Sequence, residues 1–115
     1  MHPIKIKRIY DDYAKDDGHR VLVDRIWPRG VSKEKAKLDD WCKEIAPSSE
    51  LRKWFDHKED RFDEFRNRYK KELKKHEKDL KKLREIAQEK RLCLLFGAKE
   101  KKRNQAVVLK EVLEK

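Results

Sequence analysis

An apolar run that ends abruptly in a carboxylate constrains this chain more than any other feature. Val21-Leu22-Val23 is followed by Asp24, and the next residues set two arginines and a tryptophan around Pro28 and Gly30. Three consecutive apolar residues in a short run are typical of a buried strand. A proline and a glycine then impose a turn. We therefore predict a core strand over residues 19–24, with polar side chains at its carboxyl end, where open α/β sheets usually bind ligands.

Two further segments have the patterns of strands. Residues Ile4 to Ile9 alternate between isoleucine and basic residues until Lys7-Arg8, which predicts a half-exposed edge strand. Residues Leu92 to Phe96 are apolar throughout, which predicts a central strand buried on both faces. Asp11 to Gly18 is polar and rich in turn-forming residues, so we expect a connector there.

Helical periodicity dominates the middle of the chain. Between Phe62 and Ala87, apolar residues recur at steps of three and four. An unbroken helix over 61–90 would be about 45 Å long, whereas a domain of this size is roughly 35 Å across. We therefore expect two helices with a break near His76. Shorter helical segments are expected over 32–37 and 38–45, after Ser48 or Ser49, and after Asn104, with these serines and Asn104 as candidate caps.

The order β-β-α-α-α-β-α predicts a single α/β domain over residues 1–115. We expect a small, mainly parallel sheet flanked by helices, in which the second and third strands are joined by a right-handed helical crossover. With 115 residues, the chain can bury one core but not two.

The net charge of +10 is concentrated in one part of the chain. Residues 66–103 hold 16 basic and 6 acidic residues, whereas residues 1–65 and 104–115 are each balanced. A local excess of this kind attracts polyanions, and it is equally typical of a solvated helix face. The many lysines and glutamates and the few amides resemble thermophile usage. No apolar stretch approaches the span of a bilayer and no signal peptide is apparent, so we expect a cytoplasmic protein that does not enter a membrane.

Signals for cofactor or metal chemistry are weak. Cys42 and Cys93 lie in apolar contexts without paired spacing, which suits a reducing cytoplasm. The four histidines lack ligand spacing, and no phosphate-binding glycine loop is present. We therefore expect no metal and no cofactor. Asp24 is the only catalytic candidate, and it lacks an obvious second carboxylate for paired acid–base chemistry, so whether the chain catalyses a reaction stays open.

Several separate motifs, spread over essentially the whole chain, resemble the YeaO-type family of small proteins (domain of unknown function 488). Family members often have serine at the position of Gly97 and histidine at that of Gln105. They also often have Asn-Pro at His76-Glu77, which supports a helix break there. The family is uncharacterised, so the resemblance implies a fold and a shared site but no reaction. The matching segments are Val21–Gly30, Trp41–Arg52, Phe65–Tyr69, Leu94–Lys99 and Asn104–Ala106.

A binding site for a small anionic or phosphate-bearing molecule is our leading hypothesis. If the last two strands are parallel neighbours, Asp24 meets the segment after Phe96, and the helix that begins near Asn104 presents its N–H groups to an anion. The candidate ligand-binding residues are Arg25, Trp27, Arg29, Ser48, Arg52, Lys99 and Asn104. The simpler interpretation is that Asp24 pairs with one of the arginines and that Trp27 packs in the core.

Two other functions stay open. A nucleic-acid-associated accessory protein would use the lysine-rich helix face, with Lys74, Lys78 and Lys81 as its candidates. That face lacks the interleaved aromatics that single-strand readers use and matches no named DNA-binding motif. A non-catalytic scaffolding protein would bind neither class of ligand. The oligomeric state is not indicated by the sequence.

Overall fold

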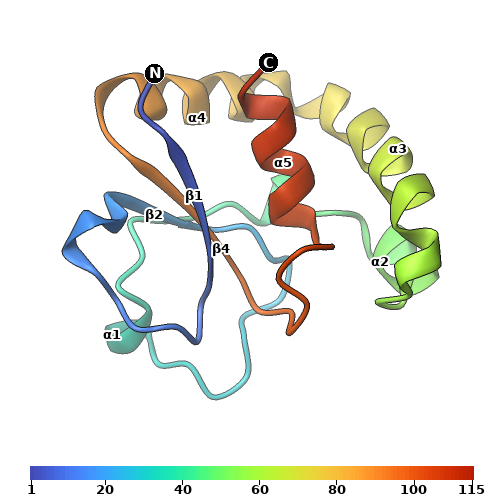
Figure 1. Cartoon of the computed structure of the whole chain (residues 1–115), viewed down its shortest axis with the longest axis horizontal. Coiled ribbons are helices and arrows are strands. Elements are labelled where there is room, and N and C mark those ends of the chain that lie inside the picture. Colours follow the sequence, from blue (N-terminus) through green and yellow to red (C-terminus); the bar gives the residue numbers. More distant parts are fainter.

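Four strands form one parallel sheet in the order β1-β4-β2-β3 (Figure 1). The computed structural model describes all 115 residues. The strands are β1 (Ile4–Arg8), β2 (His19–Leu22), β3 (Asp40–Trp41) and β4 (Leu92–Phe96). The α/β class, the edge position of the first strand and the central, fully buried last strand are thus confirmed.

Five α-helices accompany the sheet, and most begin where the sequence predicted. Ser48 caps α2 through a hydrogen bond from the Leu51 amide, and Asn104 caps α5 through one from the Val107 amide. None of the helices combines the length and apolar character needed to cross a bilayer. Their bounds are α1 Lys33–Ala36, α2 Ser49–Phe55, α3 Phe62–Leu73, α4 Glu77–Glu89 and α5 Gln105–Leu113.

The long periodic segment is interrupted as expected. A 3-10 turn, η4 (Lys74–His76), separates α3 from α4, and His76 leaves the helical conformation with φ −121° and ψ 38°. The domain measures 35 × 32 × 21 Å, so a continuous helix of about 45 Å would project beyond its own core. In Figure 1 the two helices follow an arc around the rest of the molecule.

The two faces of the sheet are covered differently. Leu92, Leu94 and Phe96 of β4 point into the larger core, against α2 to α5, whereas Cys93 and Leu95 belong to a smaller cluster on the opposite face. Figure 1 shows α3, α4 and α5 on one side of the sheet and α1 on the other. The alternation of side chains along a strand divides the apolar run of β4 between the two faces.

One segment differs from its predicted structure. Residues 38–45 do not form a helix: Asp40–Trp41 is the edge strand β3, and a 3-10 turn, η2 (Lys43–Ile45), follows it. The Cys42 amide donates to Leu22 O (3.0 Å), so the chain pairs with β2 instead of coiling. Trp41 and Cys42 accordingly pack on opposite faces, as in a strand. A two-residue strand has too few positions to show its period in the sequence. The element order is therefore β-β-α-β-α-α-α-β-α.

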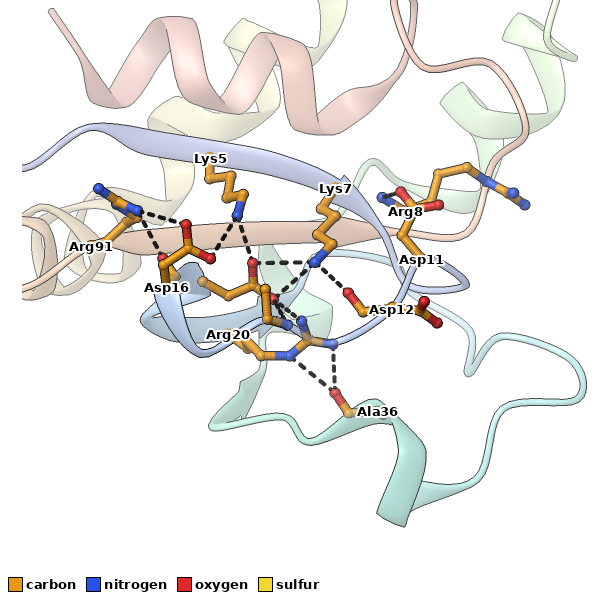
Figure 2. Close-up of polar contacts among 11 residues, drawn as sticks. Lys5, Lys7, Arg8, Asp11, Asp12, Asp16, Arg20, Ala36 and Arg91 are labelled. Atoms are coloured by element: carbon orange, nitrogen blue, oxygen red, sulfur yellow. Dashed lines mark hydrogen bonds and ion pairs between the residues drawn. The ribbon is translucent and has the colours of Figure 1, made fainter.

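The polar connector before β2 contains a buried charge that the sequence did not indicate. Asp17 ends the 3-10 turn η1 (Lys15–Asp17) and is completely buried. Figure 2 shows Lys5, Lys7 and Arg20, the three cationic residues that contact this carboxylate. Lys5 and Lys7, on one face of β1, donate to it at 2.8 and 3.1 Å, and the buried Arg20 also pairs with it. Arg20 donates further to the Ala36 carbonyl (2.8 Å), which anchors α1 to the sheet.

Candidate functional site

The site begins where β2 and β4 end side by side. The sequence expectation that Asp24 meets the segment after Phe96 is confirmed: the Gly97 amide donates to Asp24 Oδ2 at 2.8 Å. A Cβ atom on residue 97 would lie 2.9 Å from that oxygen, so the glycine permits the close approach. The parallel pairing of β2 with β4 brings the two carboxyl ends together.

The surroundings of the Asp24 carboxylate disfavour its charged form. Burial raises its pKa to about 6, although the Gly97 amide, the positive charge of Arg52 and the Gln105 side chain each lower it in part. The Gln105 side-chain amide donates to Oδ1, and the backbone carbonyl of Asp24 accepts from the Trp41 indole at 2.7 Å. The simpler interpretation of the sequence was that Asp24 pairs with one of the arginines. In the structure it pairs directly with neither Arg25 nor Arg29.

Beside Asp24 the surface is hollowed into a pocket of about 440 Å³. Its walls come from the loop after β2, from α2, from α3, from the segment after β4 and from the start of α5. Asp24 is the only carboxylate among the lining residues, whereas four arginines line it: Arg25, Arg29, Arg52 and Arg103. The pocket is therefore cationic in balance.

The guanidiniums of two of the four arginines have hydrogen-bond or ion-pair partners, and those of the other two have none. The Arg25 guanidinium donates to the carbonyls of Pro47 and Ala46 at 3.1 and 3.0 Å, and Arg103 contacts Glu100 and Glu59 at 3.1 and 3.5 Å. The guanidiniums of Arg29 and Arg52 make no hydrogen bond and no ion pair, although both line the pocket. These two cations are therefore available to an anion, while the other two are engaged.

The apolar part of the lining is largely preformed. The indole of Trp27 donates to the Val31 carbonyl (2.7 Å) and meets the Trp41 ring edge to face, with 5.2 Å between centroids. Phe55 and Phe65 are buried and stack with centroids 4.4 Å apart. Trp27 thus packs in the structure and lines the pocket at once, and the contacts hold its ring in place.

Not every candidate residue reaches the pocket. Lys99 is exposed and does not line it, and the Ser48 hydroxyl caps α2 and donates to Glu72 (2.6 Å) outside it. Asn104 lines the pocket, but its side chain is engaged in capping α5 and in a 2.8 Å hydrogen bond to the Glu100 carbonyl. The expectation that Lys99 and Ser48 contribute to one site with Asp24 is therefore not supported by this geometry.

Three lining residues with polar or charged side chains were not among the sequence candidates: His57, Arg103 and Gln105. Arg103 and Gln105 flank the predicted cap Asn104, so their position at a helix start was a usable signal. His57 follows Asp56 in a rare pair of left-handed residues, with φ 47° and 54°. The sequence carries only a weak signal for that conformation: neither residue is glycine, although Asp and His adopt it more often than most other residues do.

Other reactive groups are poorly placed for chemistry. Cys93 lies in the middle of β4 and Cys42 just after β3, both as free thiols, and burial raises the pKa of each to about 11. Such thiols are protonated at neutral pH and unreactive. No group of three or more His, Cys, Asp or Glu side chains is arranged to hold a metal ion.

On the lysine-rich face, Lys74, Lys78 and Lys81 are exposed and form no ion pair, whereas Lys70 contacts Glu111 at 3.6 Å. The face follows α3 and α4, which both pack on the large core, and it does not join the pocket.

Comparison with known proteins identifies the family of this chain. Residues 3–115 match a family model described as "Inactive DUF488-N3 subclade". The chain belongs to the YeaO-like DUF488 family.

The uncharacterized protein YeaO of Escherichia coli K12 is 46% identical over 110 residues, which is 96% of each chain. Uncharacterized proteins of Mycobacterium tuberculosis and Mycobacterium bovis are 53% identical over 66 residues, 57% of this chain and 56% of theirs. The match thus spans about half the length of these mycobacterial relatives. No solved structure matches the chain.

Proposed function

We propose that the protein binds a small anionic ligand in the pocket at the carboxyl ends of β2 and β4. The observation that carries the proposal is the pair of unengaged guanidiniums, Arg29 and Arg52, on the walls of one cationic pocket. Guanidiniums bind carboxylates and phosphates through two parallel hydrogen bonds. The amino terminus of α5 adds unpaired N–H groups and a favourable dipole at the same pocket.

A binding role is favoured over a catalytic one. Asp24 is the only carboxylate of the lining, and both of its oxygens already accept hydrogen bonds, from Gly97 and Gln105. A general base needs a free path to the proton that it removes. The description of the matching family as inactive agrees with this reasoning.

Calorimetric titration with sulfate and with phosphate tests the proposal. Arg29→Ala and Arg52→Ala should each weaken binding by about 10- to 100-fold, because each removes charge-assisted hydrogen bonds worth about 1.5–3 kcal/mol. Lys99→Ala removes a cation of the same sign from the neighbouring loop outside the pocket, so it serves as the matched control. Equal affinity in all four proteins would place any anion elsewhere and contradict the proposal.

The second candidate function is nucleic-acid binding through the lysine-rich face. It is favoured by one observation, the exposed and unpaired state of Lys74, Lys78 and Lys81. Binding of a short oligonucleotide should then fall steeply with salt and respond to substitution of these lysines but not of Arg29. If neither small anions nor oligonucleotides bind, a scaffolding role becomes the better description.

A further inference from the structure

The pocket combines its free cations with an apolar wall, and this combination restricts the ligand beyond its charge. Ile26, which lies between Arg25 and Trp27 in the sequence, is 59% exposed and lines the pocket. The other large exposed apolar residues, Met1, Tyr10 and Tyr13, lie outside it. An exposed aliphatic side chain beside unpaired guanidiniums is a surface that an organic anion covers better than an inorganic anion does.

The aromatic part of the wall is rigid before any ligand arrives. The Trp27 ring is held by its hydrogen bond to the Val31 carbonyl and by its edge contact with Trp41. Elsewhere in the lining, Phe55 and Phe65 stack against each other in the larger core. A ring that is fixed in this way loses no rotamer freedom when a flat ligand stacks on it.

The volume of the pocket also indicates an organic ligand. A pocket of about 440 Å³ lies within the range of roughly 300–1,000 Å³ that is typical of sites for small organic molecules. A single oxyanion would leave most of this space and its apolar lining filled with water. The ligand that uses both parts of the pocket therefore carries apolar area as well as charge.

We propose that the pocket takes an anion carried on a flat ring, with the phosphate or carboxylate at Arg29 and Arg52 and the ring against Ile26 and Trp27. This inference rests on the proposed function and deepens it. It requires two contacts on one ligand: a charged end that reaches the unengaged guanidiniums and a planar apolar end that covers the exposed Ile26 side chain.

Pairs of probes that differ only in the ring test it. Titrations compare phenyl phosphate with methyl phosphate, and benzoate with acetate, so the two pairs also separate a phosphate site from a carboxylate site. We expect the ring-bearing member of at least one pair to bind more than 10-fold more tightly. Ile26→Ser should reduce that preference at least threefold without changing the affinity for the ringless member. Because Ile26 is largely exposed, this variant should fold normally.

The matched control is Tyr13→Ser, which removes an exposed apolar side chain outside the pocket and should leave the ring preference unchanged. Equal binding of ring-bearing and ringless anions would overturn the inference and leave the proposed anion site standing. A ring preference that survives Ile26→Ser would overturn the assignment of the ring to this wall. Absence of binding by all four probes, with the protein folded, would overturn the proposed function as well.

Discussion

The backbone amide of Gly97 donates a hydrogen bond to Asp24 Oδ2 across 2.8 Å, although 73 residues separate the two positions. This bond joins the end of β4 to the end of β2 and holds a half-buried carboxylate at the wall of the cationic pocket. Because a Cβ on residue 97 would come within 2.9 Å of the same oxygen, a larger residue at this position would require the Asp24 side chain to shift.

Gly97→Ala should lower the free energy of unfolding by about 1–3 kcal/mol, because the added methyl group crowds Asp24. In an Asp24→Ala background the same substitution should cost much less, since the crowded oxygen is gone. Urea denaturation of the four proteins of this double-mutant cycle measures the coupling. Additive costs would mean that the methyl group is accommodated in some other way.

The stability of the protein should fall as the pH rises from about 4 to about 6. Burial raises the pKa of Asp24 to about 6 from its ordinary 3.8, so the folded protein holds a proton that the unfolded chain has lost. Unfolding then releases a proton, and a higher pH favours it, by about 3 kcal/mol at most. Denaturation of the wild type and of Asp24→Asn at several pH values isolates this contribution. Parallel curves would contradict it.

Asp17→Ala should destabilise the fold by about 3–5 kcal/mol, because it leaves the buried Arg20 without its counter-charge. Asp63→Ala is the control: it removes a carboxylate that is 96% exposed and contacts Arg66 at 3.3 Å, and it should change stability by less than about 1 kcal/mol. Thermal and urea unfolding measure both. Similar effects of the two substitutions would show that the buried cluster adds nothing beyond a surface pair.

Acid should weaken the same cluster. Burial by itself would raise the pKa of Asp17, but hydrogen bonds from Lys5, Ala14, Lys7 and Arg20 outweigh it and hold the pKa well below the ordinary 3.8. The stability that this carboxylate contributes is therefore present above about pH 4 and is lost as the pH falls further. The difference in unfolding free energy between wild type and Asp17→Ala should shrink between pH 5 and pH 2, and a constant difference would exclude this cause.

Asn104→Ala should lower the free energy of unfolding by about 1–2 kcal/mol. Asn104 accepts a hydrogen bond from the Val107 amide at the start of α5, and it is almost completely buried. Ser32→Ala removes an equivalent cap from the four-residue α1, in which only Ala36 is buried, and it should lower the free energy of unfolding by less. Urea denaturation compares the two variants. A larger cost for Ser32→Ala would reverse the importance that we assign to the two caps.

Local patterns in the sequence were sufficient for much of the fold. The break at His76 was predicted from the length that an unbroken helix would have, whereas the strand before Asp24, the apolar β4 and the cap at Asn104 follow from short-range periodicity, turn chemistry and capping. Each of these last three depends on neighbours within a few positions, so each leaves a readable pattern. The approach of Asp24 to Gly97 followed from the parallel arrangement of two such strands.

Only the tertiary structure decided which charged side chains are free. Arg25 and Arg29 are four residues apart and chemically identical, yet the Arg25 guanidinium is engaged by the Pro47 carbonyl and the Arg29 guanidinium has no partner. Asp17 looked like part of a solvated connector, but β1 and β2 bring Lys5, Lys7 and Arg20 around it. The partners come from distant segments, so no local pattern marks them. The sequence determined where the strands end, and folding determined which charges at those ends remain available to a ligand.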